Sequence, residues 1–434
     1  MTPPPPAPSR RGVLAGAASL AGAGVLPAAA VPPARAASRD RTARPVVFRD
    51  VRPFGAKRPV DLTVVGGLIS DRAAPAGAQV IDGGGRIALP TLVDAHIHPD
   101  KTTWGGSWES RRPADTIEEF AAQDVELFRR QDRSVAERAY GLMAHAVTRG
   151  TRAMRAHADV APAYGLACAE GLAQARERLR HALDVQIVAF PQHGVIRTPG
   201  TAELLKQAAR SGTVDFLGGI DPIGFDQALD EQLDLLFGLA DRYGVGLDIH
   251  LHDRGEKGRT ALRGIIDRTR TLSLHGKVTV SHVFCLPELS DADLARTAAD
   301  LADLDIALTT VAPSRSLVLP VAELTEHGVR VGLGSDGVRD AWSPFGNADM
   351  LHRAHLLGWV RDDRLDAELT GCFETGSHGG ADVMGLPRAD LSPGSPADFL
   401  LVRGECVPQI VVDLPARDVV VHRGRVVARD GALV

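Results

Sequence analysis

The stretch of sequence that decides the fold is residues 92–98, which read Leu-Val-Asp-Ala-His-Ile-His. This short apolar run ends on two histidines, and the segment Thr116–Thr148 after it places leucine, alanine and phenylalanine at helical spacing. Seven later apolar runs, most of them followed by a helical stretch, repeat the pattern: Thr151–His157, Val185–Phe190, Val214–Ile220, Gly246–His252, Lys277–His282, Ile306–Thr310 and Val329–Gly334. Eight βα units over about 250 residues match a TIM (β/α)8 barrel in number and in length. We therefore predict an α/β protein built on this barrel.

A doubly wound α/β sheet is the competing interpretation of the same alternation. That fold usually binds nucleotides through glycine-rich loops behind its strands. Neither Gly-x-Gly-x-x-Gly nor Gly-x-x-x-x-Gly-Lys-Ser/Thr follows any of the eight runs, and the glycines at 83–85 form a turn before a strand. The barrel is therefore the favoured architecture.

Short strand-like runs divided by glycine and proline turns flank the barrel on both sides. They are Pro45–Phe48, Asp61–Val65 and Gln79–Ile81 before it, and Asp398–Val402, Val419–His422 and Arg425–Ala428 after it. We expect residues 38–89 and 389–434 to form one small β-sandwich domain from both termini. The barrel then spans residues 90–388.

The first 37 residues carry the pattern of a twin-arginine export signal. Residues 9–14 read Ser-Arg-Arg-Gly-Val-Leu, an alanine- and glycine-rich run extends to about Ala30, and residues 34–36 read Ala-Arg-Ala, a small-residue cleavage site. An uncleaved membrane anchor is the alternative, but so much glycine and alanine makes a poor membrane span. We predict transport of the folded protein by the twin-arginine machinery to the periplasm or the medium, with no membrane attachment once processed.

The composition narrows the class of protein further. The 434 residues are 44% hydrophobic and 24% charged, with a net charge of −5, so the chain can bury a core and lacks the basic surface of a nucleic-acid binder. Its four cysteines are scattered without a Cys-x-x-Cys pair. This excludes a thiolate zinc cluster, including the zinc deaminases that use paired cysteines, and favours unpaired thiols over a single disulfide.

Histidine and aspartate recur where the predicted barrel strands end. The first strand ends on His96 and His98, the fifth on residues 250–253 (His-Leu-His-Asp), the sixth on His282 and the eighth on Asp336. Chemistry in this fold lies at the carboxyl ends of the strands, and residues two apart in a strand point to the same side. The sequence therefore predicts a metal site at the barrel mouth.

The segment 89–98 resembles the first barrel strand of the amidohydrolase superfamily, and with residues 99–102 (Pro-Asp-Lys-Thr) it is similar to the cytosine deaminase branch. Further pieces match in order over about residues 45–430: Arg-Ala-His-Ala-Asp at 155–159, Val-Ala-Phe-Pro-Gln at 188–192, Asp-Ile-His at 248–250, Ser-His at 281–282 and the run 336–346. The Phe-Pro-Gln and Asp-x-Trp-x-Pro pieces narrow the resemblance to the branch.

The resemblance implies His96, His98, His250 and Asp336 as metal ligands. Such a set suits one divalent ion, Zn²⁺ or Fe²⁺, and leaves a position for water, whose pKa the ion lowers. His282 corresponds to the histidine that orients this water, and Asp336 also serves as a proton acceptor.

The proton donor departs from the family pattern. Cytosine deaminases carry a glutamate three residues after the strand-five histidine, and here that position is Asp253, with Glu256 three residues further on. We favour Asp253 by position and keep Glu256 as the next candidate. The alternative for either acid is a salt bridge to Arg254 or Arg259.

Three residues are predicted to face the substrate. Gln192 matches the glutamine that reads the carbonyl and ring N–H of the base, which its amide acceptor and donors complement; a loop-capping role is the alternative. Trp342 is expected to form an apolar wall against a flat substrate ring, and His252 either contacts substrate or fills space. Trp104 and Trp108 either cover the site as a lid or pack their loop down.

The scarcity of lysine bears on the number of metal ions. Binuclear relatives in the superfamily use a carboxylated lysine or a glutamate at the end of strand four as a bridge. Here residues 216–222 contain no lysine, and Lys206 falls in the preceding helix. A single metal is therefore favoured, and Asp221 is the one residue that challenges this; its alternative role is a hydrogen bond at the barrel mouth.

The leading hypothesis is a metal-dependent hydrolytic deaminase of a small nitrogen heterocycle: cytosine-like, pterin-like, creatinine-like or triazine-like. Hydrolysis of an exocyclic N-alkyl group or of a cyclic amide would use the same ligands and stays open. A non-catalytic metal- or solute-binding protein is the remote alternative. The resemblance also leaves a homo-oligomer open.

Overall fold

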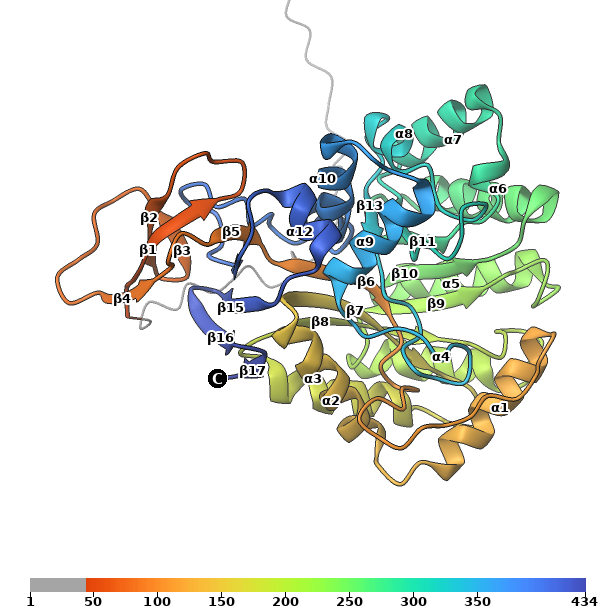
Figure 1. The fold of residues 1–434 in the computed structure, drawn as a ribbon. Coiled ribbons are helices and arrows are strands. Elements are labelled where there is room, and N and C mark those ends of the chain that lie inside the picture. The colour runs from red at the N-terminus through yellow and green to blue at the C-terminus, as the bar shows by residue number, and fades with distance from the viewer. Residues whose placement is uncertain (1–43) are drawn as a thin grey trace, which may run out of the picture.

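The computed structural model describes residues 44–434 (Figure 1). The predicted export signal over residues 1–37 lies outside this range. Within the described part of the chain, no helix combines the length and apolarity needed to cross a membrane.

Eight strands form the predicted parallel barrel, paired in chain order from first to last. Each lies within a few residues of its predicted run: β6 (Leu92–Ile97), β7 (Thr151–Asp159), β8 (Asp184–Phe190), β9 (Phe216–Ile220), β10 (Gly246–Leu251), β11 (Val278–His282), β12 (Ala307–Thr310) and β13 (Val331–Leu333). The TIM-barrel prediction is confirmed.

A short seam closes the barrel between β6 and the residues after β13. One isolated parallel bridge joins Ile97 to Asp336, whose N–H donates to the carbonyl oxygen of His96 at 2.8 Å. The two segments pass so closely that a Cβ atom at Gly334 would lie 2.6 Å from the His96 carbonyl oxygen. Only glycine fits there, because its missing side chain lets the two backbones meet.

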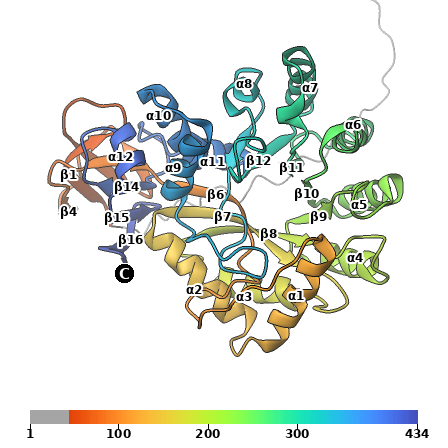
Figure 2. The same cartoon turned by 45° about the vertical axis from the view of Figure 1, so that its right-hand side comes forward.

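Helices cover the outside of the barrel (Figure 2). They are α1 (Ile117–Arg130), α2 (Val135–Thr148), α3 (Ala167–Leu179), α4 (Thr201–Ser211), α5 (Leu229–Tyr243), α6 (Gly255–Thr271), α7 (Asp291–Asp303), α8 (Val321–Glu326), α9 (Met350–Arg361), α10 (Asp366–Glu374), α11 (Gly380–Val383) and α12 (Val407–Asp413), with short turns η1 (Leu286–Glu288) and η2 (Thr375–Gly379). Capping residues fix several helix starts. Before α2, for example, the Ser134 hydroxyl accepts from the Glu137 N–H and the Glu137 carboxylate accepts from the Ser134 N–H.

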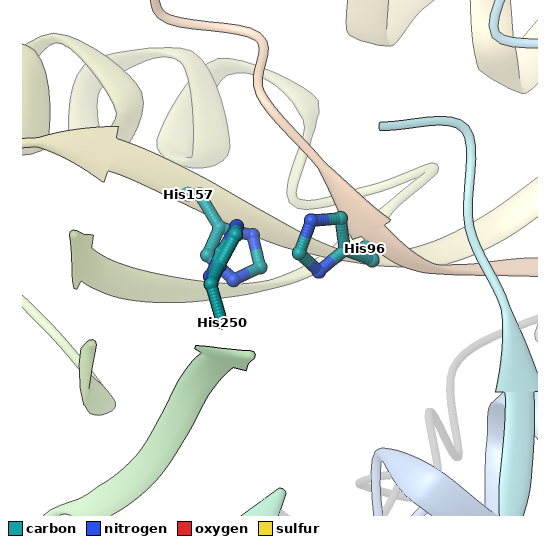
Figure 3. A group of neighbouring side chains, drawn as sticks. All are labelled: His96, His157 and His250. Carbon is teal, nitrogen blue, oxygen red and sulfur yellow. The ribbon is translucent and has the colours of Figure 1, made fainter. Parts of the chain in front are cut away.

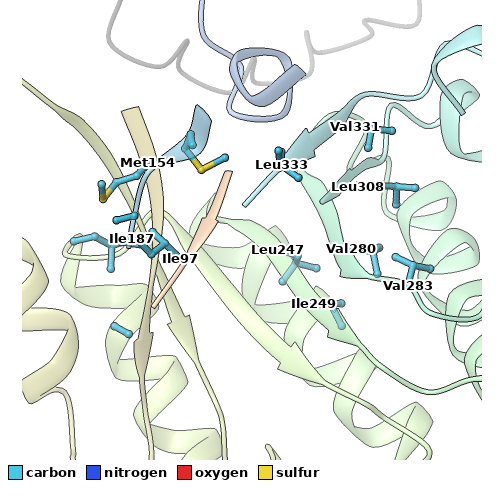
Figure 4. Packing of buried hydrophobic residues seen from close by; sticks show 14 of the residues in the cluster. Ile97, Met154, Ile187, Leu247, Ile249, Val280, Val283, Leu308, Val331 and Leu333 are labelled. Carbon is cyan, nitrogen blue, oxygen red and sulfur yellow. The ribbon is translucent and has the colours of Figure 1, made fainter. Parts of the chain in front are cut away.

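Alternation along the barrel strands separates two environments. In β10, Leu247 and Ile249 pack into the main hydrophobic cluster, part of which Figure 4 shows, whereas Asp248 and His250 belong to the opposite, polar set. The polar set includes a fully buried ion pair, in which Arg155 Nη1 donates to Asp248 Oδ2 at 3.0 Å. The barrel interior is therefore polar where its outer wall is apolar.

The chain's two ends build a second, smaller unit beside the barrel (Figure 1). Its strands follow the order β17-β16-β15-β14-β5-β1-β2-β3, with β4 paired to β1. They are β1 (Val46–Pro53), β2 (Val60–Val65), β3 (Leu68–Ser70), β4 (Gln79–Asp82), β5 (Ile87–Pro90), β14 (Phe399–Val402), β15 (Arg417–His422), β16 (Arg425–Arg429) and β17 (Ala432–Leu433).

Strand β1 belongs to both halves of this terminal sheet. Residues 46–49 pair with β2 and β4, the backbone turns at Asp50 with φ 50°, and residues 52–53 pair with β5. An apolar core lies between the halves, where Phe48 meets Phe399 edge to face with ring centroids 4.8 Å apart. The predicted β-domain from both termini is thus confirmed.

Asp398 joins the two units. Its buried carboxylate accepts from Arg152 Nη1 of β7 at 2.9 Å and from the Arg423 N–H at 2.5 Å, and it lies 3.1 Å from His422 Nδ1. Burial favours the neutral acid, but His422 and Arg152 outweigh it and lower the pKa of Asp398 to about 2. The terminal sheet is therefore tied to the barrel by a buried charge.

All four cysteines are free, as favoured from their spacing.

Candidate metal centre and active site

Three histidines and one aspartate converge at the barrel mouth. His96 and His98 leave β6 on the same side because they are two residues apart, His250 comes from β10, and Asp336 follows β13. The Nε2 atoms of His96 and His98 lie 3.3 Å apart, as do those of His98 and His250. Asp336 Oδ1 lies 3.6 Å from His96 Nε2 and 3.5 Å from His98 Nε2.

These separations fit a divalent ion. At metal–ligand distances of about 2.0–2.1 Å, tetrahedral geometry puts neighbouring donor atoms about 3.4 Å apart. The four observed separations, 3.3 to 3.6 Å, bracket that value. The Nδ1 atoms of His98 and His250 are buried without a hydrogen-bond partner, so protein groups do not compete for these rings. Four of the six donor separations within the set that the resemblance implied are therefore compatible with one divalent ion.

His157 is a fifth member of the cluster that sequence reasoning did not assign. It lies near the end of β7 and points toward His96 and His250 (Figure 3). The possible ligand atoms of the three rings all lie within 4.8 Å of one another, and both nitrogens of His157 are buried without a partner. The signal was present in the sequence, because alternation from Arg155 places His157 on the same side of the strand.

Four rings of the cluster, those of His98, His157, His250 and His282, are held in the neutral form that binds metals. Burial is the main cause, and it lowers the pKa of His98, His250 and His282 well below the usual value and that of His157 to about 4. Neighbouring rings and the Lys101 ammonium act in the same direction on His98.

A hydrogen-bond chain fixes the tautomer of His96. Ser281 donates its one hydroxyl proton to Asp248 Oδ1 at 2.6 Å and accepts from Thr309 Oγ1 at 2.8 Å. Its oxygen lies 3.0 Å from His96 Nδ1 and has no proton left to give. His96 Nδ1 therefore carries the hydrogen, and its Nε2 lone pair faces the other ligands.

His282 and Asp336 sit on strained backbone at the ends of β11 and β13. Their φ angles are 72° and 61°, in the left-handed region that residues other than glycine seldom adopt. Both ring nitrogens of His282 are buried without a partner, and the possible ligand atoms of His96, His282 and Asp336 lie within 4.8 Å of one another. Strain of this kind persists where the surroundings impose it, commonly at active sites.

The structure separates the two candidate proton donors. Asp253 is half-buried, accepts from the Gly224 N–H at 2.7 Å, and has its pKa raised by burial and by Asp221. Glu256 is on the outer side of α6, its side chain 66% exposed and hydrogen-bonded to Arg259 and Arg263, which lower its pKa to about 2. Glu256 is thus an anion held away from the histidines, in the salt bridge foreseen as its alternative role, and its placement favours Asp253.

Asp221 and His252 are partners at the end of β9 and β10. Asp221 Oδ2 lies 2.8 Å from His252 Nδ1, and Asp221 Oδ1 accepts from the backbone N–H groups of His252 and Asp253. The His252 ring lies 4.4 Å from that of His282, so it reaches the edge of the cluster. Both Asp221 oxygens are occupied by protein donors, which matches a hydrogen-bonding role at the mouth.

Comparison with known proteins identifies the family of this chain. A sequence model described as "Amidohydrolase family" matches residues 79–434. The chain belongs to the amidohydrolase family. It is an enzyme of the class that hydrolyses carbon–nitrogen bonds other than peptide bonds.

Three relatives of this amidohydrolase stand out. It is 32% identical over 355 residues to the uncharacterized protein YahJ of Escherichia coli strain K12, with 80% of this chain and 76% of YahJ covered. It is 28% identical to N-isopropylammelide isopropyl amidohydrolase of Pseudomonas sp. strain ADP, with 85% and 94% covered. The crystal structure of N-isopropylammelide isopropylaminohydrolase from Burkholderia multivorans superposes with a TM-score of 0.85 and 38% identity, covering 90% of this chain and 100% of that one.

The substrate side of the amidohydrolase site lies between β6, β8 and the loop after β13. Phe190, at the end of β8, stacks on His250 with ring centroids 3.9 Å apart, and Gln192 follows two residues later. Lys101 Nζ donates to Gln192 Oε1 at 3.1 Å and lies 5.9 Å from the Trp342 ring. Trp342 stacks on Phe120 of α1, a helix that sequence reasoning did not implicate, and its predicted contact with a substrate ring stays a prediction.

The two tryptophans after β6 behave differently. Trp104 packs against His145 of α2 with ring centroids 4.6 Å apart, which holds the loop down. Trp108 is 64% exposed and has the Arg339 guanidinium near its ring. Of the two predicted roles, packing describes Trp104, and only Trp108 is free to cover the mouth.

Proposed function

We propose that this amidohydrolase hydrolyses the bond between a ring carbon and an exocyclic amine on a small oxo-substituted nitrogen heterocycle. The observation that carries the proposal is the three-histidine, one-aspartate set at tetrahedral separations, with His282 beside Asp336 and with Gln192 and Trp342 on the substrate side. The remote alternative of a non-catalytic binding protein explains neither the strained His282 and Asp336 backbone nor the family membership.

In this proposal His96, His98, His250 and Asp336 hold one divalent ion, Zn²⁺ or Fe²⁺, with His157 beside them. The ion would lower the pKa of a bound water towards neutrality. It would also act as a Lewis acid that polarises the substrate at the reacting ring carbon. A second ion is disfavoured, because β9 ends without a lysine and both Asp221 oxygens are occupied by protein donors.

The chain's own residues then handle the protons. Asp336, whose side chain is 39% exposed, accepts a proton from the attacking water. His282 orients that water through a ring nitrogen that has no protein partner. Asp253, whose raised pKa favours the protonated form, donates to the ring nitrogen, and the amine leaves with a proton as the carbon–nitrogen bond breaks.

The leaving amine separates two candidate reactions. Release of ammonia from a C–NH₂ group is the deaminase reaction, while release of an alkylamine is the N-alkyl hydrolase reaction. The relatives at 28% and 38% identity are named as isopropyl amidohydrolase and isopropylaminohydrolase of N-isopropylammelide, so we favour the alkylamine reaction on a triazine-like ring and keep ammonia release as the second candidate.

The test is an amine-release screen on the zinc-loaded and iron-loaded enzyme. N-alkylammelides, ammelide, cytosine, pterin and creatinine would be compared, with ammonia and alkylamine assayed separately and metal content measured in the same preparation. We expect turnover of an N-alkylated or amino-substituted oxotriazine and about one metal per chain. No amine from any of these rings by a metal-replete enzyme would contradict the proposed reaction, and two metals per chain would contradict the mononuclear site.

We propose in addition that the enzyme acts outside the cytoplasm, on the strength of the twin-arginine pattern at residues 9–14. Arg10→Lys together with Arg11→Lys should retain the protein in the cytoplasm, as measured by fractionation. An unchanged distribution would overturn the proposed export route.

A further inference from the structure

We propose that Lys101 is a positioning residue that fixes the Gln192 amide with its NH₂ group toward the substrate, so that the pocket selects ring edges that offer hydrogen-bond acceptors. The inference rests on the proposed function and sharpens its substrate class. It concerns two side chains brought together from segments 91 residues apart.

The Lys101 ammonium is buried and contacts three acceptor side chains of the protein. It donates to Asp159 Oδ2 at 2.9 Å and to Gln192 Oε1 at 3.1 Å, and it lies 3.4 Å from Asp124 Oδ2. Burial opposes its charge, but the Asp159 and Asp124 carboxylates outweigh that effect and raise the pKa of Lys101 well above its usual value. Lys101 is therefore held as a cation by the protein, and two of its N–H groups are donated to Asp159 and Gln192.

This cation dictates how the Gln192 amide is oriented. An ammonium has donors only, so the amide atom that faces Lys101 must be the oxygen. The amide NH₂ group is then on the other side, and Nε2 forms no hydrogen bond within residues 44–434. In this proposal Gln192 presents its two N–H donors to whatever enters the mouth, while its oxygen is turned to Lys101.

The amide is close to the reacting centre. Gln192 is two residues beyond Phe190, whose ring stacks on His250, and the Lys101 ammonium lies 5.9 Å from the ring of Phe190. The buried indole N–H of Trp342, on the same side of the mouth, also lacks a partner among residues 44–434. The Gln192 amide and the Trp342 indole therefore both have N–H donors without a protein partner on this side of the pocket.

The sequence-based expectation for Gln192 changes accordingly. An unconstrained glutamine complements a lactam edge, which pairs a carbonyl with a ring N–H. A glutamine whose oxygen is held by Lys101 complements a carbonyl next to an unprotonated ring nitrogen, or the enolate form of an oxo-ring. The substrate class is therefore an oxo-rich heterocycle bound through acceptors, and rings that carry amino donors at that edge are rejected.

The experiment measures the binding of two triazines of equal size to the zinc-loaded enzyme by titration calorimetry. Cyanuric acid carries carbonyl oxygens at the three positions where melamine carries amino groups, and the titration is run at a pH at which cyanuric acid is a monoanion, so that a carbonyl lies next to an unprotonated ring nitrogen. We expect wild type to bind cyanuric acid at least about 10-fold tighter than melamine. Ammonia is assayed in the same samples, and if melamine is consumed its KM replaces the dissociation constant.

Gln192→Glu is the decisive variant. A carboxylate still accepts from Lys101, so the buried cation stays paired, but the donors that face the substrate are lost. The preference for cyanuric acid should collapse to within about 2-fold, while Gln207→Glu, the same charge change on the exposed face of α4, should leave it intact. Lys101→Met should also collapse the preference, because the amide is then free to turn.

An unchanged preference in Gln192→Glu, or equal binding of both rings by wild type, would overturn the inference. If Lys101→Met does not fold, Gln192→Glu still decides the question. Binding is measured without turnover, so an enzyme that shows the preference but releases no amine contradicts only the proposed reaction.

Discussion

The barrel interior and the core of the terminal sheet both contain fully buried side chains, but those in the barrel interior are charged and those in the terminal sheet are apolar. Inside the barrel, Arg155 and Asp248 form an ion pair at 3.0 Å, and their side chains are at most 1% exposed. In the terminal sheet, Phe48 and Phe399 meet as bare hydrocarbon, both of them fully buried. A buried ion pair is poor evidence of stability, since its desolvation offsets its attraction, whereas buried aromatic rings stabilise directly.

The difference shows which region serves stability and which serves chemistry. The polar groups of the barrel interior have a defined task, because Asp248, through Ser281, orients His96, which we propose as a metal ligand. The terminal sheet has no such task within the described residues, and an apolar cluster lies between its two halves. Changes inside the barrel should therefore alter activity and metal binding, and changes in the terminal sheet should alter stability.

The largest effect is expected at the metal aspartate and its neighbour. Asp336→Ala should lower kcat by more than about 10⁴-fold, and His282→Asn by at least about 10²-fold, because each removes a proton-handling group. Circular dichroism and thermal unfolding should show a retained fold. Retained turnover in either variant, with metal replete, would break the assigned roles.

The next effect separates the two acids after β10. Asp253→Ala should lower kcat by roughly 10²–10⁴-fold, as expected for loss of a general acid. Glu256→Ala, the matched control, should leave kcat within about 2-fold, because its side chain is exposed and paired with arginines. The reverse ranking would reassign the proton donor to Glu256.

In the terminal sheet the expected effect is on stability alone. Phe399→Ala removes a fully buried ring and should lower the free energy of unfolding by about 3–5 kcal/mol. The kcat of the protein that remains folded should be unchanged. Trp359→Ala, at a site 78% exposed, serves as the control and should change stability by less than about 0.5 kcal/mol. A loss of kcat in folded Phe399→Ala would show that the two regions are not separable.

The smallest effect tests the tautomer of His96. Ser281→Ala should weaken zinc affinity by about 10–100-fold, measured by competition with a chelator, because Nδ1 loses the acceptor that fixes it. Ser316→Ala on an exposed loop should not change the affinity. Unweakened zinc binding in Ser281→Ala would mean that the Ser281 hydroxyl does not orient His96.

The parts of this protein whose structure follows from a short-range sequence pattern, such as an apolar run or the alternation of side chains along a strand, were predictable from sequence. All eight barrel strands were found from apolar runs, and alternation alone placed His96 and His98 on one side of β6. His157 was equally accessible to that reasoning, but a role is not visible in a strand whose nine residues are all buried. Predictability ended where a side chain depends on a distant partner.

Two residues show that limit in physical detail. The orientation of the Gln192 amide is set by Lys101, which reaches it from the loop after β6, and no spacing rule relates the two. The exposure of Glu256 depends on α6 beginning at Gly255, which turns that side chain outward to Arg259 and Arg263. Helix starts are the least certain part of a sequence-based assignment, so the choice between Asp253 and Glu256 required the structure.

The short seam between β6 and the residues after β13 links binding of a metal ion to closure of the barrel. Only one isolated bridge pairs the two segments, yet His96 and His98 approach from one side of it and Asp336 from the other. An ion bound by these residues would add a cross-link between the first and last strands of the barrel, which the backbone joins only through this single bridge. Occupancy of the site and closure of the barrel are then linked equilibria, and each favours the other. Under the proposed function, the same three side chains serve as metal ligands and also join the two ends of the barrel sheet.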